Sequence, residues 1–345
     1  MLAMSKENKF DKYKNNGLTG LANIGNTCFI NSTIQCLSHI YELNIFLDSG
    51  TYKKRINKVP ESLLLIEWDK LRNLMWSENC IIKPAGFINA IHKVAHLKDK
   101  DIFTGYAQND LTEFMNFLFT SFHEAIKREV DMNVKGNVKN KTDKLAKVCY
   151  DMMKNMYKNE YSEFLKMFYG ICVSEIKSLD SNYENIVPEP FFNIDIPIDK
   201  HNTLIECLEQ YTENEILDND NKILNDETGK KEKASKRILF WNLPDILIIS
   251  LKRFSNNNKK NDKKIEFPLK NLDMSKFILG YDKNSYKYDL FGICNHHGGV
   301  NGGHYTAFVK NANESWYNFN DTNVSKIKID DLQGTGAYCF FYRKV

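Results

Sequence analysis

The chain has 345 residues, of which 42% are hydrophobic and 12% aromatic, and its formal net charge is +3. This length exceeds the usual size of one hydrophobic core, so we expect two or three packed subdomains. The small charge, with lysines interspersed among acids, argues against nucleic-acid binding, and no apolar segment is long enough to predict a membrane span.

The N-terminal part predicts a tail, a loop and then a helix that begins with a cysteine. Residues 1–16 are polar, which predicts a flexible tail, and the glycines within residues 17–27 predict tight turns. From Cys28 to Tyr41, apolar residues recur at helical spacing. Backbone N–H groups and the helix dipole at this N-terminus favour a thiolate at Cys28. Most free cysteines are buried apolar residues, and we interpret Cys36 in that way.

The helical pattern continues through a subdomain that we place at residues 17–166. Asp110 followed by Glu113 is typical of an N-cap with a glutamate at the third position, which predicts a helix over residues 111–126. A charged helical insert follows near 127–160.

A β-rich subdomain is predicted at residues 167–345, where the apolar period changes to two. Thr203 and Glu206 form a capping-box pattern that predicts a short helix. Asp218 to Lys236 is polar and charged, which predicts an exposed loop, whereas the apolar run Ile246–Leu251 predicts a strand buried on both faces. Helices first and strands second predict an α+β fold.

A histidine near the C-terminus completes a candidate catalytic set. Residues 287–294 predict a strand and residues 295–302 a loop, after which a second strand, from about Gly303 to Lys310, carries His304. A neighbouring strand that ends at Asn320 would bring its amide oxygen against one imidazole nitrogen and leave the other facing a thiol. Cys28, His304 and Asn320 are the groups that a cysteine protease needs.

Most histidines on strands are packed structural residues, and we interpret most of the others here in that way: His39, His92, His96, His123 and His201. His296 and His297 are intermediate, because the predicted loop that carries them lies close to the candidate site. Asn320-Asp321 alone is also compatible with a simple turn at the end of a strand.

Four motifs in order along the chain resemble those of the ubiquitin-specific proteases, a deubiquitinating family with a papain-like core. They are the runs Gly17–Gln35, Gln108–Phe114, Ile246–Phe254 and Asn295–Asp321. The similarity extends from about Gly17 to Tyr342. It implies a papain-like α+β fold with a helical thumb, a β-rich palm and a fingers extension, with the active cleft between thumb and palm.

By position, the resemblance implies a role for each residue of the site. Cys28 matches the nucleophile, His304 the general base and Asn320 the residue that orients the base. Asn23 matches the oxyanion-hole amide, and Asp321 a neighbouring acid that is sometimes given a catalytic role.

Substrate-binding residues are implied around the same motifs. Asp110 matches an acid that contacts the C-terminal tail of ubiquitin, a role that is compatible with helix capping. Gln108 and His296 lie in the same motifs, and we expect both at the substrate. Gly302 and Gly303 leave no side chains before His304, which suits a tail ending in Gly-Gly.

The implied function is hydrolysis of the isopeptide or peptide bond after the C-terminal Gly-Gly of ubiquitin. The alternatives are cleavage of another ubiquitin-like modifier and, less favoured, an inactive ubiquitin-binding scaffold. We expect ubiquitin and ubiquitin-conjugated proteins as partners, no nucleic acid or membrane partner, and a monomer.

The cysteines argue against a metal site. Many family members carry two Cys-x-x-Cys pairs that bind a structural zinc at the tip of the extension. This chain has eight cysteines and no Cys-x-x-Cys, so we expect no zinc, no cofactor and a less rigid extension. Thiols without an evident disulfide pattern predict a reducing compartment, the cytosol or nucleus of its own or a host cell.

Overall fold

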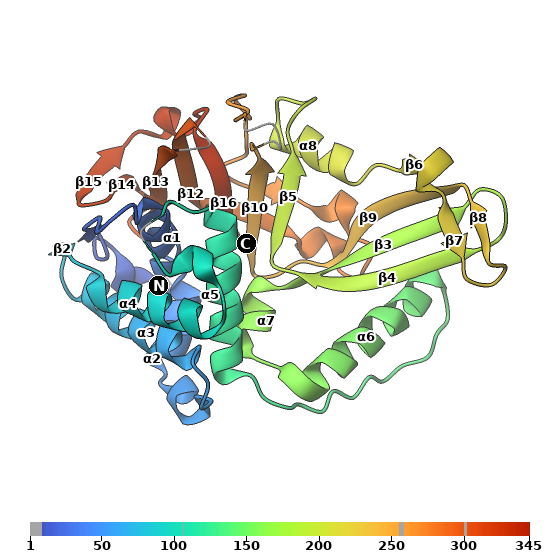
Figure 1. Cartoon of the computed structure of the whole chain (residues 1–345), viewed down its shortest axis with the longest axis horizontal. Helices are drawn as coiled ribbons and strands as arrows, with labels where there is room; N and C mark the ends of the chain where they lie inside the picture. The colour runs from blue at the N-terminus through green and yellow to red at the C-terminus, as the bar shows by residue number, and fades with distance from the viewer. Residues whose placement is uncertain (1–8, 106, 255–258, 300–301) are drawn as a thin grey trace, which may run out of the picture. The chain divides into compact units, whose positions relative to one another are not determined.

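The computed structural model describes residues 9–105, 107–254, 259–299 and 302–345 of a mixed helix and sheet chain (Figure 1). Two compact units are present. As far as these ranges are described, the first unit comprises Met1–Lys127, Arg253–Ile265 and Leu290–Tyr342. The second unit comprises Arg128–Lys252, Glu266–Asp289 and Arg343–Val345.

This division differs from the predicted boundary between residues 166 and 167. The strands that carry His304 belong to the same unit as the helix of Cys28, because α1 (Cys28–Ser38) packs against β13 (Gly302–Lys310). Every residue of α1 is buried, so the helix is a core element between other layers of this unit. The second unit begins at Arg128, and the predicted insert near 127–160 belongs to it.

The first unit contains a group of helices whose apolar stripes face each other. They are α1, α2 (Tyr41–Asp48), α3 (Ser62–Ser77), α4 (Ala85–Leu97) and α5 (Leu111–Ile126). α3 packs against both α4 and α5, with Trp68 and Phe122 fully buried between them. A short parallel pair, β1 (Gly20–Leu21) and β2 (Ile81–Ile82), joins the loop before Cys28 to the segment after α3.

The predicted N-terminal tail lies partly outside the described residues, which begin at residue 9. Asp11–Tyr13 form a 3-10 turn, and the Tyr13 side chain is buried. Its ring stacks on Tyr41 with centroids 4.6 Å apart and meets Trp76 edge-on at 5.0 Å. This part of the predicted tail is therefore packed on the core, because its aromatic ring has apolar partners.

An antiparallel sheet completes the first unit. Its strand order is β15-β14-β13-β12-β16, with bounds β12 (Lys287–Gly299), β13, β14 (Trp316–Asn320), β15 (Asn323–Ile327) and β16 (Ala337–Lys344). The predicted loop over residues 295–302 is wrong for most of its length, because β12 stays paired with β13 as far as Gly299 opposite Gly302. Residues 300–301 of that loop lie outside the described part.

The second unit holds a four-stranded antiparallel sheet in the order β4-β3-β9-β6 (Figure 1). Its strands are β3 (Gly170–Ser178), β4 (Glu184–Phe191), β6 (Glu215–Leu217) and β9 (Ala234–Asn242). α6 (Lys141–Glu160) contributes Ala146 and Cys149 to a core shared with Ile171 and Trp241 of this sheet. The predicted helical insert therefore packs on the core of its own unit.

Smaller elements complete the second unit: α7 (Glu163–Phe168), α8 (Leu204–Tyr211), β5 (Asn193–Pro197), the hairpin β7 (Ile223–Asn225) and β8 (Lys230–Glu232), β10 (Ile246–Lys252) and β11 (Leu272–Asp273). Two predictions are confirmed here: β10 is buried from Ile246 to Leu251, and Thr203 and Glu206 form the capping box of α8. Within the described residues, no helix has the length and apolar character needed to cross a bilayer.

Candidate active site

Cys28 is the first residue of α1, as the glycine-rich approach and helical spacing predict, and its side chain is only 3% exposed. Burial raises the pKa of this thiol, and the nearby Asp321 carboxylate also raises it, whereas backbone N–H groups of Tyr305 and Phe29 lower it. The net shift is upward. The predicted position is confirmed, but the helix terminus alone does not outweigh desolvation, so a thiolate here requires a charged partner.

His304 and Asn320 are brought together by neighbouring strands. β13 pairs with β14 with Ala307 opposite Phe319, which places Asn320 at the end of β14 near the start of β13. The imidazole Nε2 lies 2.6 Å from the Asn320 Oδ1. Because an amide oxygen only accepts, Nε2 carries the proton and Nδ1 keeps a lone pair that can take a thiol proton.

Asn23 organises the loop that leads into the nucleophile. Its Oδ1 accepts hydrogen bonds from the backbone N–H of Gly25 at 3.3 Å and of Thr27 at 3.1 Å. Its Nδ2 donates to the Asp321 Oδ2 at 3.0 Å. One N–H of the amide is thus engaged, and the described residues offer no acceptor to the other, which leaves it as a candidate donor to an oxyanion.

Asp321 is held from two further directions. Its Oδ1 accepts from the Asn31 Nδ2 at 2.8 Å, and its backbone carbonyl accepts from the Leu21 N–H at 2.8 Å. Gly20 permits this close approach, because a Cβ there would lie 2.4 Å from the carbonyl oxygen of Thr322. Asp321 therefore couples the loop before Cys28 to the end of β14.

Gln108 reaches both the nucleophile and the strand of the base. Its Nε2 donates to the Gly303 carbonyl at 2.6 Å, and its Oε1 accepts from the Gly303 N–H at 3.0 Å. The same Nε2 lies 3.8 Å from the Cys28 sulfur. Among the residues that the structure describes, this amide is the side-chain group within hydrogen-bonding geometry of that sulfur. In this structure, Gln108 is thus a link between the loop before α5 and β13.

Asp110 is the N-cap of α5, as predicted. Its Oδ1 accepts from the backbone N–H groups of Thr112 at 2.8 Å and Glu113 at 3.1 Å, and its Oδ2 accepts from the Tyr338 hydroxyl at 2.5 Å. The capping interpretation is confirmed. The contact with a substrate tail stays a prediction.

A pocket of about 500 Å³ opens beside Gln108 and Asp110. Its lining is Ala107, Gln108, Asn109, Asp110, Phe254, His296 and Tyr305. His296 belongs to β12, is 3% exposed and lies between the rings of Phe254 and Tyr305, at 5.2 and 4.7 Å. Burial lowers the pKa of His296 to about 4, and Lys260 adds to the shift. A neutral, buried ring thus forms one wall of this pocket.

The two glycines before His304 differ. A Cβ on Gly303 would lie 2.3 Å from the His296 Nε2 and 2.6 Å from the His297 carbonyl oxygen. A Cβ on Gly302 would meet nothing within 4 Å. The predicted close approach of another backbone is therefore found at Gly303, and Gly302 faces open space.

All residues predicted for the site belong to the first unit. Sequence reasoning missed Asn31 and Tyr338, which hold the two acids of the site. Asn31 carries a detectable signal, because it lies three residues after Cys28 and is a polar residue in a helix that is buried throughout.

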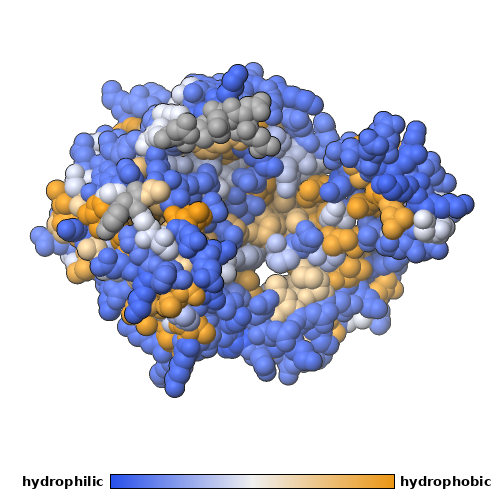
Figure 2. Space-filling model, viewed as in Figure 1, coloured by the Kyte–Doolittle hydropathy of each residue, from blue (hydrophilic) through white to orange (hydrophobic). Residues whose placement is uncertain are grey.

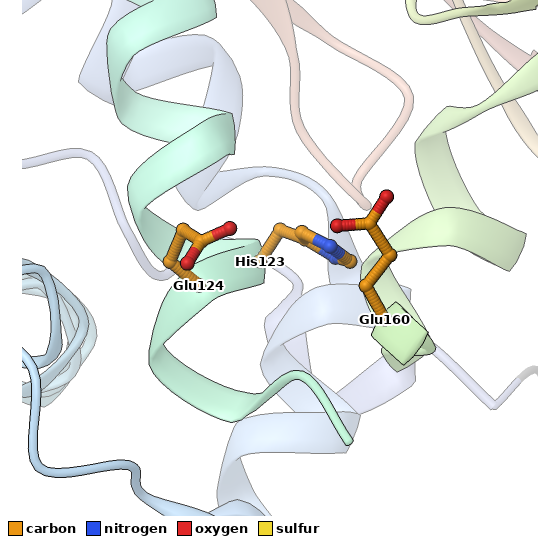
Figure 3. Close-up of side chains that lie close together, drawn as sticks. All are labelled: His123, Glu124 and Glu160. Atoms are coloured by element: carbon orange, nitrogen blue, oxygen red, sulfur yellow. The ribbon is translucent and has the colours of Figure 1, made fainter. Parts of the chain in front are cut away.

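Three side chains with metal-ligand chemistry are drawn in Figure 3. His123 and Glu124 lie near the C-terminal end of α5 in the first unit, and Glu160 is the last residue of α6 in the second. The first unit contributes two of these side chains and the second unit one, whereas a structural zinc site takes four ligands. All eight cysteines are free thiols, and the predicted structural Cys36 is fully buried with its sulfur 3.6 Å from that of Cys294.

Comparison with known proteins tests the family resemblance of the four sequence motifs. A family model described as "Ubiquitin carboxyl-terminal hydrolase" matches residues 19–342. "Ubiquitin carboxyl-terminal hydrolase 2" of Homo sapiens is 31% identical over 340 residues, covering 94% of this chain and 55% of the relative. The protein of the same name from Gallus gallus is 32% identical and is covered over 93% of its length. The chain thus spans about half the length of the human relative.

Solved structures of similar fold include the Ubp8 module described as "SAGA Ubp8/Sgf11/Sus1/Sgf73 DUB module bound to ubiquitin aldehyde". It matches with a TM-score of 0.73 and 26% identity over 96% of this chain and 70% of that one. A second structure of the module, bound to monoubiquitin, has the same TM-score at 24% identity and covers 100% of this chain and 72% of that one. These matches confirm the predicted papain-like fold class.

Proposed function

This chain belongs to the ubiquitin carboxyl-terminal hydrolase family, and we propose that it is a deubiquitinase that hydrolyses the isopeptide or peptide bond after the C-terminal Gly-Gly of ubiquitin. The observation that carries the proposal is the hydrogen bond of 2.6 Å from the His304 imidazole to Asn320, in the same compact unit as a buried cysteine at a helix N-terminus.

The reaction begins with proton transfer from the Cys28 thiol to Nδ1 of His304. The thiolate attacks the carbonyl carbon of the terminal glycine, and the oxyanion is stabilised by the Cys28 backbone N–H and the free N–H of Asn23. His304 then donates this proton to the lysine nitrogen. The bond between carbonyl carbon and nitrogen breaks, the lysine amine leaves, and the ubiquitin tail stays bound to Cys28 as a thioester. A water that loses its proton to His304 hydrolyses the thioester. Asn320 keeps the neutral imidazole in one tautomer and accepts from the same nitrogen when the ring is protonated.

Asp321 acts through Asn23. Its carboxylate holds one amide N–H of Asn23 at 3.0 Å, which fixes the direction of the other N–H toward the reacting carbonyl. We therefore assign Asp321 a positioning role and keep proton transfer for His304.

Substrate binding is proposed for the groups around the pocket of about 500 Å³. Ubiquitin's tail is basic, and Asp110 is the acidic side chain that lines this pocket. Gln108 offers an amide that already pairs with backbone groups of Gly303, which is the chemistry a glycine tail presents. Gly302 leaves space at the same strand end, and His296 supplies a neutral wall.

Two alternatives are distinguishable by experiment. Cleavage of another ubiquitin-like modifier would share the tail chemistry, and a panel of modifiers separates it. An inactive ubiquitin-binding scaffold would bind ubiquitin tightly without turnover. The presence of the thiol, imidazole and amide of the site favours the enzyme. We further propose ubiquitin-conjugated proteins as substrates, a monomeric state and a reducing compartment, which suits eight free thiols.

The test uses ubiquitin that carries an electrophile at its C-terminus, with the product read by intact mass. A single adduct is expected for the unmodified protein and for Cys36→Ala, and none for Cys28→Ala. An adduct that persists in Cys28→Ala would contradict the assignment of the nucleophile. No adduct with folded protein would favour another modifier or the scaffold.

A further inference from the structure

The tip of the four-stranded sheet does not fit the zinc that many relatives hold there. Between Ser178 and Lys233, which includes both hairpins at this end, the sequence contains one cysteine, Cys207, and that residue is buried in α8. The side chains that gather at the tip are the serine hydroxyls and asparagine amide that contact Glu232, and the carboxylate of Asp180 lies beside them. Zinc in structural sites takes thiolate and imidazole ligands, so this set does not suit the ion.

A single carboxylate lies at the centre of this group. Glu232, the last residue of β8, accepts hydrogen bonds at Oε2 from the hydroxyls of Ser178 at 2.6 Å and Ser181 at 2.7 Å. Its Oε1 accepts from the Asn225 Nδ2 at 2.8 Å. Three donors from three points of the chain thus meet one side chain.

These donors come from two different hairpins. Ser178 is the last residue of β3, Ser181 lies in the turn between β3 and β4, and Asn225 is the last residue of β7 before the turn to β8. The backbone continues the connection, because the Leu179 N–H donates to the Lys233 carbonyl at 2.8 Å and the Lys233 N–H donates to Asp180 at 2.8 Å. Glu232 therefore joins the two hairpins at their turns.

The centre of the network is shielded from water, whereas Ser181 at its edge is exposed. Glu232 is 8% exposed and Asn225 is 1% exposed. A carboxylate in such a place is stable only when its oxygens are hydrogen-bonded, and here both of them are. The hydroxyls of Ser178 and Ser181 lower the pKa of the Glu232 carboxyl, so it remains ionised and its hydrogen bonds are charge-assisted.

Two exposed leucines flank the anchored residues. Leu179 follows Ser178 and is 55% exposed, and Leu224 precedes Asn225 and is 56% exposed. Figure 2 shows a mostly hydrophilic surface at this end of the second unit, interrupted by hydrophobic residues. Each leucine is next in sequence to a residue whose side chain donates to Glu232.

We propose that Glu232, with Ser178, Ser181 and Asn225, replaces the metal of related proteins in joining the two hairpins, and that it thereby positions Leu179 and Leu224 to contact the folded body of ubiquitin. The first part stands on the network alone. The second part rests on the proposed function.

The test compares Glu232→Ala and Glu232→Gln with Glu227→Gln, an exposed glutamate in the turn of the same hairpin whose side chain is outside the network. Hydrogen exchange of residues 178–183 and 225–230 should accelerate in both Glu232 variants and remain unchanged in the control. Metal analysis of the purified protein should find no zinc, and a chelator should leave its exchange unchanged. Bound zinc at one equivalent, or unchanged exchange in Glu232→Ala, would overturn the network.

Enzyme activity then tests the second part of the proposal, the contact of Leu179 and Leu224 with the folded body of ubiquitin. Glu232→Ala should raise KM for a ubiquitin-based substrate about tenfold, because an interface that must be ordered on binding loses affinity. Turnover of a short peptide ending in Gly-Gly should stay unchanged, since it lacks the folded body. Equal losses on both substrates would overturn the positioning role. No turnover of either substrate by the unmodified protein would count against the proposed function, and the exchange and metal results would still decide the network.

Discussion

The Asn23 side-chain amide donates to the Asp321 carboxylate at 3.0 Å, so the loop before the nucleophile is held by the residue that follows Asn320. Asp321 has a φ of 49°, in the left-handed region, and its second oxygen accepts from Asn31 of α1 at 2.8 Å. The turn after β14 therefore contacts both the imidazole and the loop before Cys28, and we propose that Asn320 orients the base and that Asp321 orients the oxyanion amide.

This division of roles predicts different kinetic effects for two neighbouring residues. Asn320→Ala should lower kcat by about 100-fold, the lower end of what a well-oriented general base contributes. Asp321→Ala should lower kcat less, because Asn23 keeps its own hydrogen bonds to Gly25 and Thr27. Cys28→Ala should abolish turnover while the melting temperature is retained. If kcat were unchanged in Asn320→Ala and strongly reduced in Asp321→Ala, Asp321 would be the residue that orients the base.

Asn31→Ala is also expected to weaken the positioning of Asn23, because Asn31 holds the other carboxylate oxygen of Asp321. The substitution removes a buried donor and leaves the Asp321 Oδ1 without this hydrogen bond, which costs about 1–3 kcal/mol of folding free energy. Because Asp321 then positions Asn23 less well, kcat should fall while KM for a ubiquitin substrate stays constant. Asn31→Asp is the matched variant, since it keeps the shape and places a like charge beside Asp321. A loss of stability with unchanged kcat would limit Asn31 to a structural role.

Gln108 predicts a change in the reactivity of the nucleophile. Its amide lies 3.8 Å from the Cys28 sulfur, and an N–H donor stabilises a thiolate more than a thiol. Gln108→Ala should therefore shift the pH profile of Cys28 alkylation to higher pH, and Gln108→Glu should shift it further through its negative charge. The alkylated Cys28 peptide is quantified by mass, which separates it from exposed Cys80. An unchanged profile in both variants would exclude this contact from tuning the thiol.

Much of the site was predictable because its elements are local or ordered by strand pairing. Cys28 at a helix start, Asp110 as an N-cap and Asn320 beside His304 each follow from spacing within one element or between adjacent strands. The raised pKa of Cys28 was not predictable in the same way, because it depends on burial by segments far away in the sequence.

The polar run Asp218 to Lys236 shows where sequence reasoning failed. Its charge predicts an exposed loop, yet it contains β7 and β8 and the buried residues Asn225 and Glu232. The charged composition of this segment indicates that its burial would be unfavourable. It does not show which hydrogen-bond donors elsewhere in the chain compensate for that burial. Those donors, the hydroxyls of Ser178 and Ser181, lie some 50 residues earlier in the chain.

The glycine pair before His304 offers a matched stability test. Gly303→Ala would place a Cβ 2.3 Å from the His296 Nε2, and overpacking of this kind costs about 1–3 kcal/mol. Gly302→Ala meets nothing within 4 Å and should leave the free energy of unfolding nearly unchanged. Urea unfolding of the two variants measures the difference. Equal stabilities would show that β12 and β13 relax enough to accept a side chain at Gly303.

His296 predicts a dependence of stability on pH. Its pKa is about 4 in the folded chain, mainly because of burial, and about 6.5 when unfolded. Between these values the unfolded chain binds a proton that the folded chain does not, so the free energy of unfolding falls as the pH drops through this window. His296→Gln should flatten this part of the profile, whereas His201→Gln, outside the pocket, should leave it intact. The profile is read from urea midpoints between pH 7 and about pH 4. A slope that survives His296→Gln would assign the proton uptake to other groups, of which His297, also with a lowered pKa, is the first to replace.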